Sequence, residues 1–348
     1  MSRAARPVAK APGRTAGRTA GKAATRAPGR PLVTAAICTY QRYDMLGDAI
    51  ASLLRQSMPP ECYRIVVVDN SPNPALSQEA AGRWRGQTNL RWIHEQTAGL
   101  SHARNAAIAA ADTPFIAFLD DDAVACDDWL EAVLEAFERL GPAAHVIGGR
   151  VRPRFGAPRP EWLSERLQAY LSVCDLGDKT RLLRPGEWVV GANISYRTER
   201  LRAVGGFSTA LGRVGGGAAL MSNDETELED RLRAQGGQTG YTPRAEVEHF
   251  VSADRLTQDW FRRRVAWQAV SDFVHSPLRM QEAAGEAWER LKGYLASCPP
   301  ADRTMRALAI PQESAEQFGY QMSAVYETIV ALLSGQADAD ADADADAN

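Results

Sequence analysis

The sequence has little of what marks a disulfide-stabilised or zinc-binding protein. Its 348 residues include only five cysteines, and no two of them form a CxxC pair. An odd number of widely separated cysteines argues against a disulfide framework or a zinc site and favours a reducing compartment. We therefore expect free thiols at Cys38, Cys62, Cys126, Cys174 and Cys298.

Long apolar runs and a strong excess of charge are also absent. No apolar stretch approaches the roughly 18 residues of a membrane span, and the N-terminal residues lack the apolar core of a signal peptide. The net charge of −3 makes no case for a nucleic-acid-binding body. We expect a cytoplasmic protein without a nucleic-acid partner, for which peripheral association with the inner face of a membrane stays open.

Both ends have low-complexity sequences that cannot build a core. Residues 1–31 contain eight Arg or Lys residues and no acid, which predicts a disordered basic arm. Such arms touch nucleic acid or anionic lipid in some proteins, and more often they are only solubilising tails. Residues 336–348 hold an Ala-Asp repeat, which predicts a disordered acidic tail.

The most informative stretch is residues 114–124, in which a short apolar run leads directly into three carboxylates. Such a run predicts a strand buried on both faces, as in a parallel sheet. Asp120, Asp121 and Asp122 cannot follow it into the core, because unpaired buried charge is too costly. They should lie at the C-terminal end of the strand, where open α/β sheets bind ligands. Clustered oxygens there suit a hard divalent cation shared with phosphate, although a polar turn before the next helix is the simpler alternative.

Strands and helices alternate through the first half of the chain. We expect a helix capped by Asp44 after the first strand and another over 102–111, after Ser101. This alternation predicts a parallel, doubly wound sheet whose strands end at one edge. Asp69, at the end of the second strand, should therefore face the same crevice as the three aspartates. The strands are expected at 32–39, 63–68, 90–94, 114–119 and 146–151.

Four segments of this half carry a more specific signal. They are Cys38-Thr39-Tyr40-Gln41-Arg42, Val68-Asp69-Asn70-Ser71, Gly99-Leu100-Ser101-His102-Ala103-Arg104-Asn105 and Leu119-Asp120-Asp121-Asp122. In their order and spacing, these segments resemble the nucleotide-sugar half of a family 2 glycosyltransferase with the GT-A fold. No GxGxxG follows the first strand, which excludes a Rossmann dehydrogenase.

The resemblance implies that two of these residues recognise the nucleotide of a nucleotide-diphosphate sugar. Asp69 would bind the base or ribose, and Arg104 would help to hold the nucleotide. From the residues alone, Arg104 could instead pair with a neighbouring acid, and residues 69–72 could form only a turn.

The resemblance also implies a metal-bridged diphosphate. Asp120 and Asp122 would bind the ribose and a Mg²⁺ or Mn²⁺ ion, with Asp122 as the metal ligand. Asp121 would be a further nucleotide-sugar contact. Thr39 and Tyr40 are strand-end residues, and we include them as additional candidate contacts with the donor.

The sequence of the second half predicts fewer helices and strands. We expect this half to form the acceptor side of the protein. Residues 153–187 predict one helix, near 162–171, and residues 188–196 predict a strand with a glycine kink. The resemblance places the Gly-Ala-Asn backbone of this strand near the donor sugar, which makes Asn193 a candidate contact. Asn193 could equally satisfy local backbone groups. The glycine-rich residues 215–219 predict a flexible loop that orders on substrate binding.

Asp224 and Glu225 are the candidates for catalysis. Acids at the start of a helix are favoured by its dipole, which is the simpler explanation. The family resemblance implies that an acidic pair before a Thr-Glu-Leu run supplies the catalytic base from its second member. Aligned on Thr226-Glu227-Leu228, that member is Glu225. The usual order of the pair is Glu then Asp, so the reversed order here leaves open which acid reaches the acceptor.

A last strand is expected over residues 246–250, and it contains a candidate metal ligand, His249. A lone histidine is more often structural, but the resemblance implies that a histidine in a Val-x-His context can complete the metal shell. A helix over 260–268 follows, whose basic and aromatic residues could cover the donor or face solvent. The candidates for that cover are Arg263, Arg264 and Trp267.

We therefore predict an α/β protein with the GT-A fold: a doubly wound, mostly parallel sheet, flanking helices and a C-terminal helical extension. Residues 32–275 would form the transferase domain, with a nucleotide-sugar half (32–152) and an acceptor half (153–275). Residues 276–335 would form the helical extension, through which the protein could form oligomers.

The predicted activity is metal-dependent, inverting transfer of a sugar from a nucleotide-diphosphate sugar to a hydroxyl acceptor. The acceptor would be a glycan, a lipid-linked sugar or a cell-surface polysaccharide precursor. One alternative is a catalytically inactive regulator that binds nucleotide sugars on the same fold. Another is an anionic-surface or nucleic-acid binder that acts through the basic arm.

Overall fold

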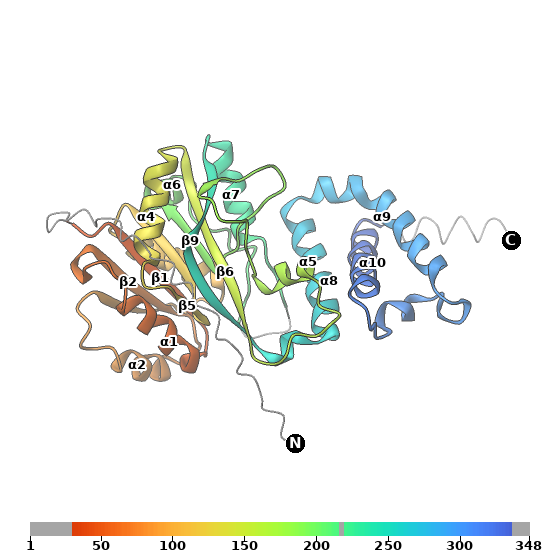
Figure 1. Ribbon diagram of the computed structural model, residues 1–348, viewed down its shortest axis with the longest axis horizontal. Helices are drawn as coiled ribbons and strands as arrows, with labels where there is room; N and C mark the ends of the chain where they lie inside the picture. Colours follow the sequence, from red (N-terminus) through yellow and green to blue (C-terminus); the bar gives the residue numbers. More distant parts are fainter. Residues whose placement is uncertain (1–29, 216–218, 336–348) are drawn as a thin grey trace, which may run out of the picture.

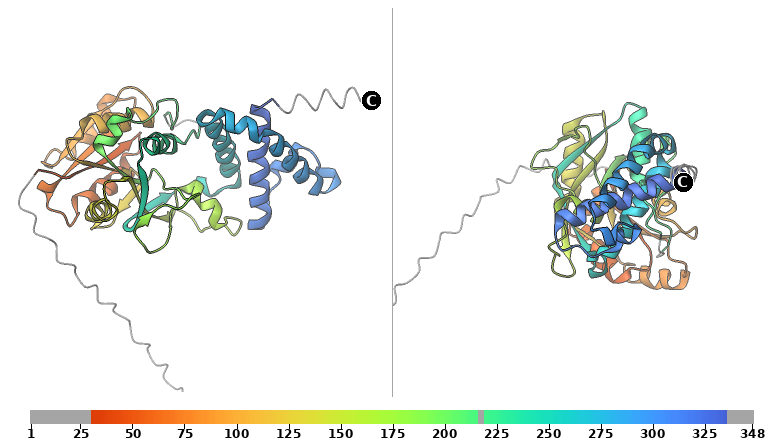
Figure 2. Two further views of the ribbon diagram at one scale, coloured as in Figure 1. Left: turned by 90° about the horizontal axis from the view of Figure 1, so that it is seen from above. Right: turned by 90° about the vertical axis from the view of Figure 1, so that its right-hand side faces the viewer.

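The computed structural model describes residues 30–215 and 219–335. The predicted basic arm before residue 30, the glycine-rich residues 216–218 and the Ala-Asp tail lie outside these ranges. The described residues form a body built on one twisted sheet and, to one side of it, a group of helices from the last part of the chain (Figures 1 and 2).

The first half of the sheet has the predicted parallel alternation. Its strands are β1 (Val33–Thr39), β2 (Tyr63–Asp69), β3 (Leu90–His94) and β4 (Phe115–Asp120), in the spatial order β3-β2-β1-β4. The helices between them are α1 (Tyr43–Leu54), α2 (Pro74–Gly82) and α3 (Leu100–Ala110), and α4 (Trp129–Leu140) follows β4. All pairings among these four strands are parallel.

These strands are apolar at consecutive positions because each one has a core on both sides. Ala35 and Ile37 of β1 belong to one apolar cluster, with buried residues of α1 and α4. Ala36 belongs to the opposite cluster, with buried residues of α3. A strand covered on both faces cannot alternate apolar with polar residues, so the unbroken apolar runs of the sequence predicted this part of the sheet.

The second half of the sheet mixes directions. β8 (Asn193–Arg197) lies between β4 and β6 (Ala144–Phe155) and is antiparallel to both. The long strand β9 (Gln238–Val251) runs parallel to β6, and the short strands β5 (Ala123–Ala125) and β7 (Arg181–Leu182) pair antiparallel with it. The nine strands of the described residues thus form one mixed, mostly parallel sheet. The sequence analysis placed a shorter last strand at 246–250 and did not predict β5.

Two predicted helix starts are wrong by two residues. α1 begins at Tyr43 after Arg42, so Asp44 lies in the first turn and is not the cap. α3 begins at Leu100 after Gly99, whose φ of 137° is open to glycine but strained for other residues. Ser101 does not cap this helix, because its hydroxyl donates to the carbonyl of Leu211 at 2.8 Å.

The remaining helices surround the second half and form the extension. α8 and α10 belong to one apolar cluster with the 163–171 segment, and α9 packs against α10. Within the described residues, no helix is both long enough and apolar enough to cross a membrane. The helices are α5 (Glu165–Gln168), α6 (Thr198–Ala203), α7 (Asp224–Ala234), α8 (Gln258–His275), α9 (Pro277–Ser297) and α10 (Ala315–Leu333).

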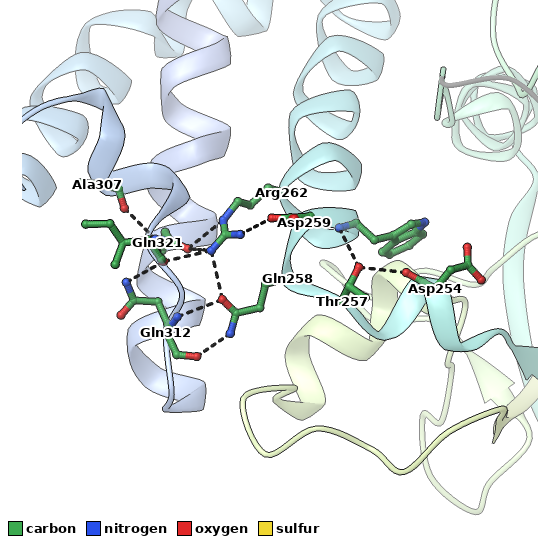
Figure 3. A network of polar contacts seen from close by, with 10 residues as sticks. Asp254, Thr257, Gln258, Asp259, Arg262, Ala307, Gln312 and Gln321 are labelled. Carbon is green, nitrogen blue, oxygen red and sulfur yellow. Dashed lines mark hydrogen bonds and ion pairs between the residues drawn. The ribbon is translucent and has the colours of Figure 1, made fainter.

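A polar network fixes the extension to α8 (Figure 3). Arg262 of α8 donates to the side chain of Gln321 on α10 and to the carbonyl of Ile310, both at 3.1 Å. The fully buried Gln321 donates in turn to the carbonyl of Ala307 at 2.8 Å. Gln258, one turn before Arg262, donates to the carbonyl of Gln312 at 2.5 Å. Because these amide and guanidinium groups satisfy backbone carbonyls of the extension, α8 and the extension are joined by specific contacts as well as by apolar packing.

One buried acid should make the stability of this fold depend on pH. Glu229 of α7 is 7% exposed and accepts a hydrogen bond from Thr239 of β9 at 2.8 Å. Burial raises the pKa of Glu229 from its ordinary 4.5 to about 7. The folded protein therefore keeps this proton between pH 4.5 and 7, where the unfolded chain releases it, and stability falls as pH rises through that range.

We expect Glu229→Gln to remove this dependence, because glutamine keeps the acceptor for Thr239 and cannot ionise. The variant should be more stable than the wild type at pH 8, by up to about 3 kcal/mol, and the gap should close toward pH 4.5. Urea unfolding of both proteins across this range measures the gap. A stability difference that stays constant with pH would contradict the assignment.

Candidate active site

The carboxyl ends of the central parallel strands bring acids from distant parts of the chain together. Thr39 at the end of β1 lies opposite Asp69 of β2, and β4 ends beside β1 at Asp120. Asp121 and Asp122 follow directly and are only 1% and 5% exposed. Removing a carboxylate from water without a partner costs several kcal/mol, so neighbouring residues must compensate these charges.

Arg42 and Thr39 supply that compensation. The Thr39 hydroxyl donates to Asp121 Oδ2 at 2.7 Å. The Arg42 guanidinium contacts Asp121 Oδ1 at 2.8 Å and Asp122 Oδ2 at 2.5 Å. Gln41, directly before Arg42, has a left-handed φ of 57°, a costly conformation for a residue with a side chain. The chain after β1 is thus held in a strained turn next to the residue that bridges the two aspartates.

Asp120, Asp122 and His249 form a group of potential metal ligands. One ligand atom from each residue lies within 4.8 Å of the others. His249 Nε2 is 3.1 Å from Asp122 Oδ1 and 3.9 Å from Asp120 Oδ2. The β5–β9 pairing sets this geometry, because Ala123 is the register partner of His249 and the Phe250 N–H donates to the Asp122 carbonyl at 2.9 Å. Two carboxylates and one imidazole are a suitable ligand set for a divalent cation.

The two buried aspartates differ in charge. Burial raises the pKa of Asp121 to about 7. Burial also opposes ionisation of Asp122, but hydrogen bonding and charge from His249, together with Arg42, outweigh it and hold the pKa of Asp122 well below its ordinary range. A carboxylate must be ionised to bind a cation. Asp122 is therefore the better ligand of the two.

A second acidic pair, Asp224 and Glu225, begins α7 beside Arg104 of α3. The buried guanidinium of Arg104 donates to Asp224 Oδ2 and lies 3.5 Å from Glu225 Oε1. It also lies over the rings of Phe118 and Phe207, at 5.9 and 5.0 Å from their centres. These contacts hold Arg104 in one place, and its charge is directed at the acidic pair.

The members of this pair have different environments. Burial and the charge of Glu225 raise the pKa of Asp224 to about 7. Burial opposes ionisation of Glu225 as well, but the charge of Arg104 and a hydrogen bond from Asp224 outweigh it, so the pKa of Glu225 is lowered. The Glu225 side chain is 22% exposed, against 3% for Asp224. Glu225 is thus the ionised and accessible member.

Gly191 provides the space that Glu225 occupies. A Cβ atom at Gly191 would lie 1.8 Å from Glu225 Oε1 and 2.7 Å from Arg104 Nη2. Residues 188–192 run past the acidic pair without regular structure, and β8 begins only at Asn193. The predicted strand over 188–196 is therefore too long at its start.

Two buried arginines, one near each acidic group, have N–H donors without partners. Within the described residues, Nε of Arg255 and both Nε and Nη1 of Arg264 are buried and make no hydrogen bond. Burial and the charge of Arg213 lower the pKa of each side chain to about 10, so both stay charged at neutral pH. Arg255 interacts electrostatically with Asp122, and Arg264 with Glu225. Buried guanidinium N–H groups without partners are donors that a bound anion can satisfy.

Asp69 uses both carboxylate oxygens inside the fold. Oδ1 accepts from the N–H and the hydroxyl of Ser71 at 2.9 and 2.5 Å, and Oδ2 accepts from the Tyr43 hydroxyl at 2.9 Å. Its side chain is fully buried. The structure therefore places Asp69 at the predicted edge of the sheet, in a turn that its own carboxylate stabilises.

Asn193 is also engaged internally. Its Oδ1 accepts from Trp129 Nε1 at 2.9 Å, and its Nδ2 donates to the carbonyls of Ala245 at 2.7 Å and Arg150 at 3.1 Å. These contacts join α4, β6, β8 and β9. Tyr40 is half-buried, and its hydroxyl would lie 3.4 Å from a Cβ atom at Gly215.

The three residues of α8 that were predicted to cover the donor differ in their exposure to solvent. Arg263 is exposed, Trp267 is half-buried, and Arg264 is the member that lies by the acidic pair. Sequence reasoning did not assign a role to Arg42 or Arg255. Arg42 is the last residue of the segment 38–42, which carries part of the family resemblance. Its place just after the end of a strand was the sequence signal for a role in the site. Arg255 stands in a short 3₁₀ turn with no motif around it.

Comparisons with known proteins identify a family for this chain. Residues 34–199 match the family model for glycosyl transferase family 2. A glucosyl-dolichyl phosphate glucuronosyltransferase of Haloferax volcanii is 28% identical over 245 residues, which cover 70% of this chain and 76% of the relative. The succinoglycan biosynthesis protein ExoM of Rhizobium meliloti is 28% identical over 262 residues, which cover 74% and 78%.

A solved structure has the same fold. The mannosyltransferase PcManGT from Pyrobaculum calidifontis, solved in complex with GDP-Man and Mn²⁺, aligns with a TM-score of 0.57 and 18% identity over 88% of each chain. This likeness confirms the predicted fold, a GT-A sheet with flanking helices. Through a domain that includes residues 34–199, the chain belongs to glycosyl transferase family 2 and is a glycosyltransferase.

Proposed function

We propose that this glycosyltransferase is metal-dependent and inverting, and that it moves a sugar from a nucleotide-diphosphate sugar to a hydroxyl acceptor. The observation that carries the proposal is the presence of two acidic groups with opposite tasks at one sheet edge. Asp120, Asp122 and His249 offer ligands for a cation. Asp224 and Glu225 offer an ionised carboxylate for proton transfer.

The donor diphosphate is proposed to lie between these groups. Arg255 and Arg264 have buried N–H donors without partners, and each interacts electrostatically with one of the acidic groups. Phosphate oxygens are strong acceptors for guanidinium groups. PcManGT was solved with a nucleotide-diphosphate sugar and Mn²⁺, which supports the same class of donor here.

Asp122 and His249 would hold the cation, with Asp120 as a further oxygen ligand. When bound, a divalent ion supplies positive charge that stabilises a leaving diphosphate. Arg42 keeps Asp122 in place by contacting its other oxygen. His249 presents Nε2 to the aspartates, 3.1 Å from Asp122 Oδ1, and an imidazole nitrogen is a common metal ligand.

Glu225 is proposed to take the proton of the acceptor hydroxyl as its oxygen attacks the sugar. A single displacement of this kind inverts the anomeric centre and needs no nucleophile from the protein. Arg104 favours the ionised form of Glu225, and Asp224 bonds to Arg104 from the buried side. The presence of this acidic pair argues against the inactive-regulator alternative.

The acceptor is proposed to be a glycan or a lipid-linked sugar. The names of two relatives, a transferase for glucosyl-dolichyl phosphate and a protein of succinoglycan biosynthesis, support this class. Action on a lipid-linked acceptor would place the protein at the inner face of a membrane as a peripheral protein.

The metal assignment is tested by removing one ligand. We expect Asp122→Asn to lower donor cleavage in Mn²⁺ by at least about 100-fold, since even supporting residues of a metal site cost 10- to 100-fold. EDTA should abolish the wild-type activity. Cleavage is measured as release of UDP or GDP from a panel of nucleotide sugars.

Asp121→Asn is the matched control. Burial already favours the neutral form of Asp121, so an amide there should be tolerated much better. Full activity of Asp122→Asn, together with resistance of the wild type to EDTA, would rule out the metal site.

The base assignment is tested with Glu225→Gln and Asp224→Asn. Glu225→Gln should lower kcat by about 10² to 10⁴, the usual range for a positioned general base, and leave the KM for the donor nearly unchanged. Asp224→Asn should cost less, because Asp224 acts through Arg104. An inactive Asp224→Asn variant beside an active Glu225→Gln variant would reverse the two roles.

The phosphate assignment is tested by binding. Arg264→Gln should weaken the binding of UDP or GDP by about 10- to 100-fold, the usual effect of losing a hydrogen bond to a charged group. Binding of the corresponding nucleoside should not change. Arg263→Gln, on the exposed side of the same helix, is the control. Calorimetric titration in Mn²⁺ measures both, and an equal effect of the two variants would contradict a specific contact.

A further inference from the structure

Asn223 stands directly before the acidic pair, and its conformation is unusual. Its backbone is left-handed, with a φ of 70°, which is uncommon outside glycine. It occupies the N-cap position of α7, where asparagine normally accepts a hydrogen bond from the first turn. Here its side chain makes no such bond. Asn223 therefore gives up the usual capping contact, and its side chain must have another partner.

That partner is a polar stripe on α8. Asn223 Nδ2 donates to Asp272 Oδ1 at 2.6 Å, and Asn223 Oδ1 accepts from Gln268 Nε2 at 2.8 Å. Gln268 Nε2 also donates to Asp272 Oδ1 at 2.8 Å, which closes a triangle of three side chains. Asn223 thus uses both its donor and its acceptor on two residues of another helix.

The stripe extends to a third residue and to the preceding position in the chain. Arg264 donates to Gln268 Oε1 at 2.9 Å and to the Ser222 hydroxyl at 3.3 Å. The Ser222 N–H is bound by Ser271 Oγ at 3.0 Å. Arg264, Gln268 and Asp272 are spaced by four residues, so they lie on one face of α8. This face contacts both residues that lead into Asp224.

The C-terminal extension also contacts this stripe of α8, through Asp272. The Tyr326 hydroxyl, on α10, donates to Asp272 Oδ2 at 2.7 Å. Asp272 therefore has one oxygen toward the residue before the acidic pair and the other toward the extension. Asp272 and Tyr326 thus tie the position of Asn223 to α10. Arg262 and Gln258 join α8 to the extension at a separate place on the helix (Figure 3).

We propose that Gln268, Asp272 and Tyr326 are positioning residues that act through Asn223 to place Glu225 for catalysis. The inference rests on the proposed role of Glu225 as the base. Glu225 is two residues beyond Asn223 at the start of a rigid helix, so a change in the backbone at Asn223 moves its carboxylate. The helical extension is then a working part of the active site, because it determines where the base stands.

The kinetic test compares variants of this contact with a matched control. Asp272→Ala and Asn223→Gly should each lower kcat by about 10- to 100-fold, the cost of a displacement of about 1 Å at a reacting group, and leave the KM for the donor unchanged. Asn223→Gly keeps a residue that adopts a positive φ easily, so its loss of activity would show that the side-chain contacts matter. The probe is the UDP- or GDP-sugar that the wild type cleaves in Mn²⁺.

Arg262→Gln is the control, because it removes contacts between the same helix and the same extension without touching Asn223. It should lower the melting temperature and leave kcat unchanged. The double variant Asp272→Ala with Asn223→Gly should be no slower than the slower single variant, since both remove one interaction. Additive losses, or equal loss of kcat in Arg262→Gln, would show a general effect of destabilisation and overturn the proposal.

A structural measurement separates this inference from the proposed activity. In a crystal structure of Asp272→Ala, we expect Asn223 to leave its left-handed conformation and the Glu225 carboxylate to move away from Gly191. An unchanged Glu225 would overturn the positioning role, whether or not the wild type cleaves a nucleotide sugar. A displaced Glu225 with full activity would instead refute its role as the base.

Discussion

The ion pair between Arg104 and the Asp224–Glu225 pair is the interaction on which the site depends. Two adjacent carboxylates in a buried place could not both ionise without a nearby cation, because desolvation and mutual repulsion would protonate them. Arg104 is itself buried, and a lone guanidinium there would be as costly as a lone carboxylate. The three groups are therefore stable only together, which ties α3 of the first half of the chain to α7 of the second.

Arg42 has the same function for the aspartates after β4, so each acidic group of the site has its own arginine. The two arrangements differ in what remains free. Arg104 and its acids form a closed group, with only Glu225 partly exposed. Around Asp122, one oxygen faces Arg42 and the other faces His249, and Arg255, whose buried Nε has no hydrogen-bond partner among the described residues, interacts with this carboxylate electrostatically.

The sequence predicted the parts of this architecture that depend on local pattern. The runs of β1, β2 and β4 are apolar at most consecutive positions because both faces are covered, and the carboxylates that end β2 and β4 mark the edge of the sheet. The antiparallel insertion of β8 between β4 and β6 leaves no such signal, since strand order depends on long-range packing. The three residues of β5 are too few to show a period. From the sequence, Asn193 could either contact the donor or bond to groups within the protein. The hydrogen bonds to Trp129 and Ala245, which lie far away in the sequence, show that it does the second.

The order of strands in the sheet has a consequence for the biosynthesis of the chain. β1 to β4 are neighbours in space and complete by residue 120, so they can pair while translation continues. Within the described residues, β6 pairs with β8 and β9, apart from an isolated bridge between Val151 and Cys174, and β5 pairs with β9. The buried part of β6, residues 144–151, therefore emerges from the ribosome before its partners, and its edge toward β8 stays open until residue 193 follows. Open apolar edges invite pairing between chains. A ribosome stalled between residues 155 and 193 would therefore hold a nascent chain that is prone to aggregate.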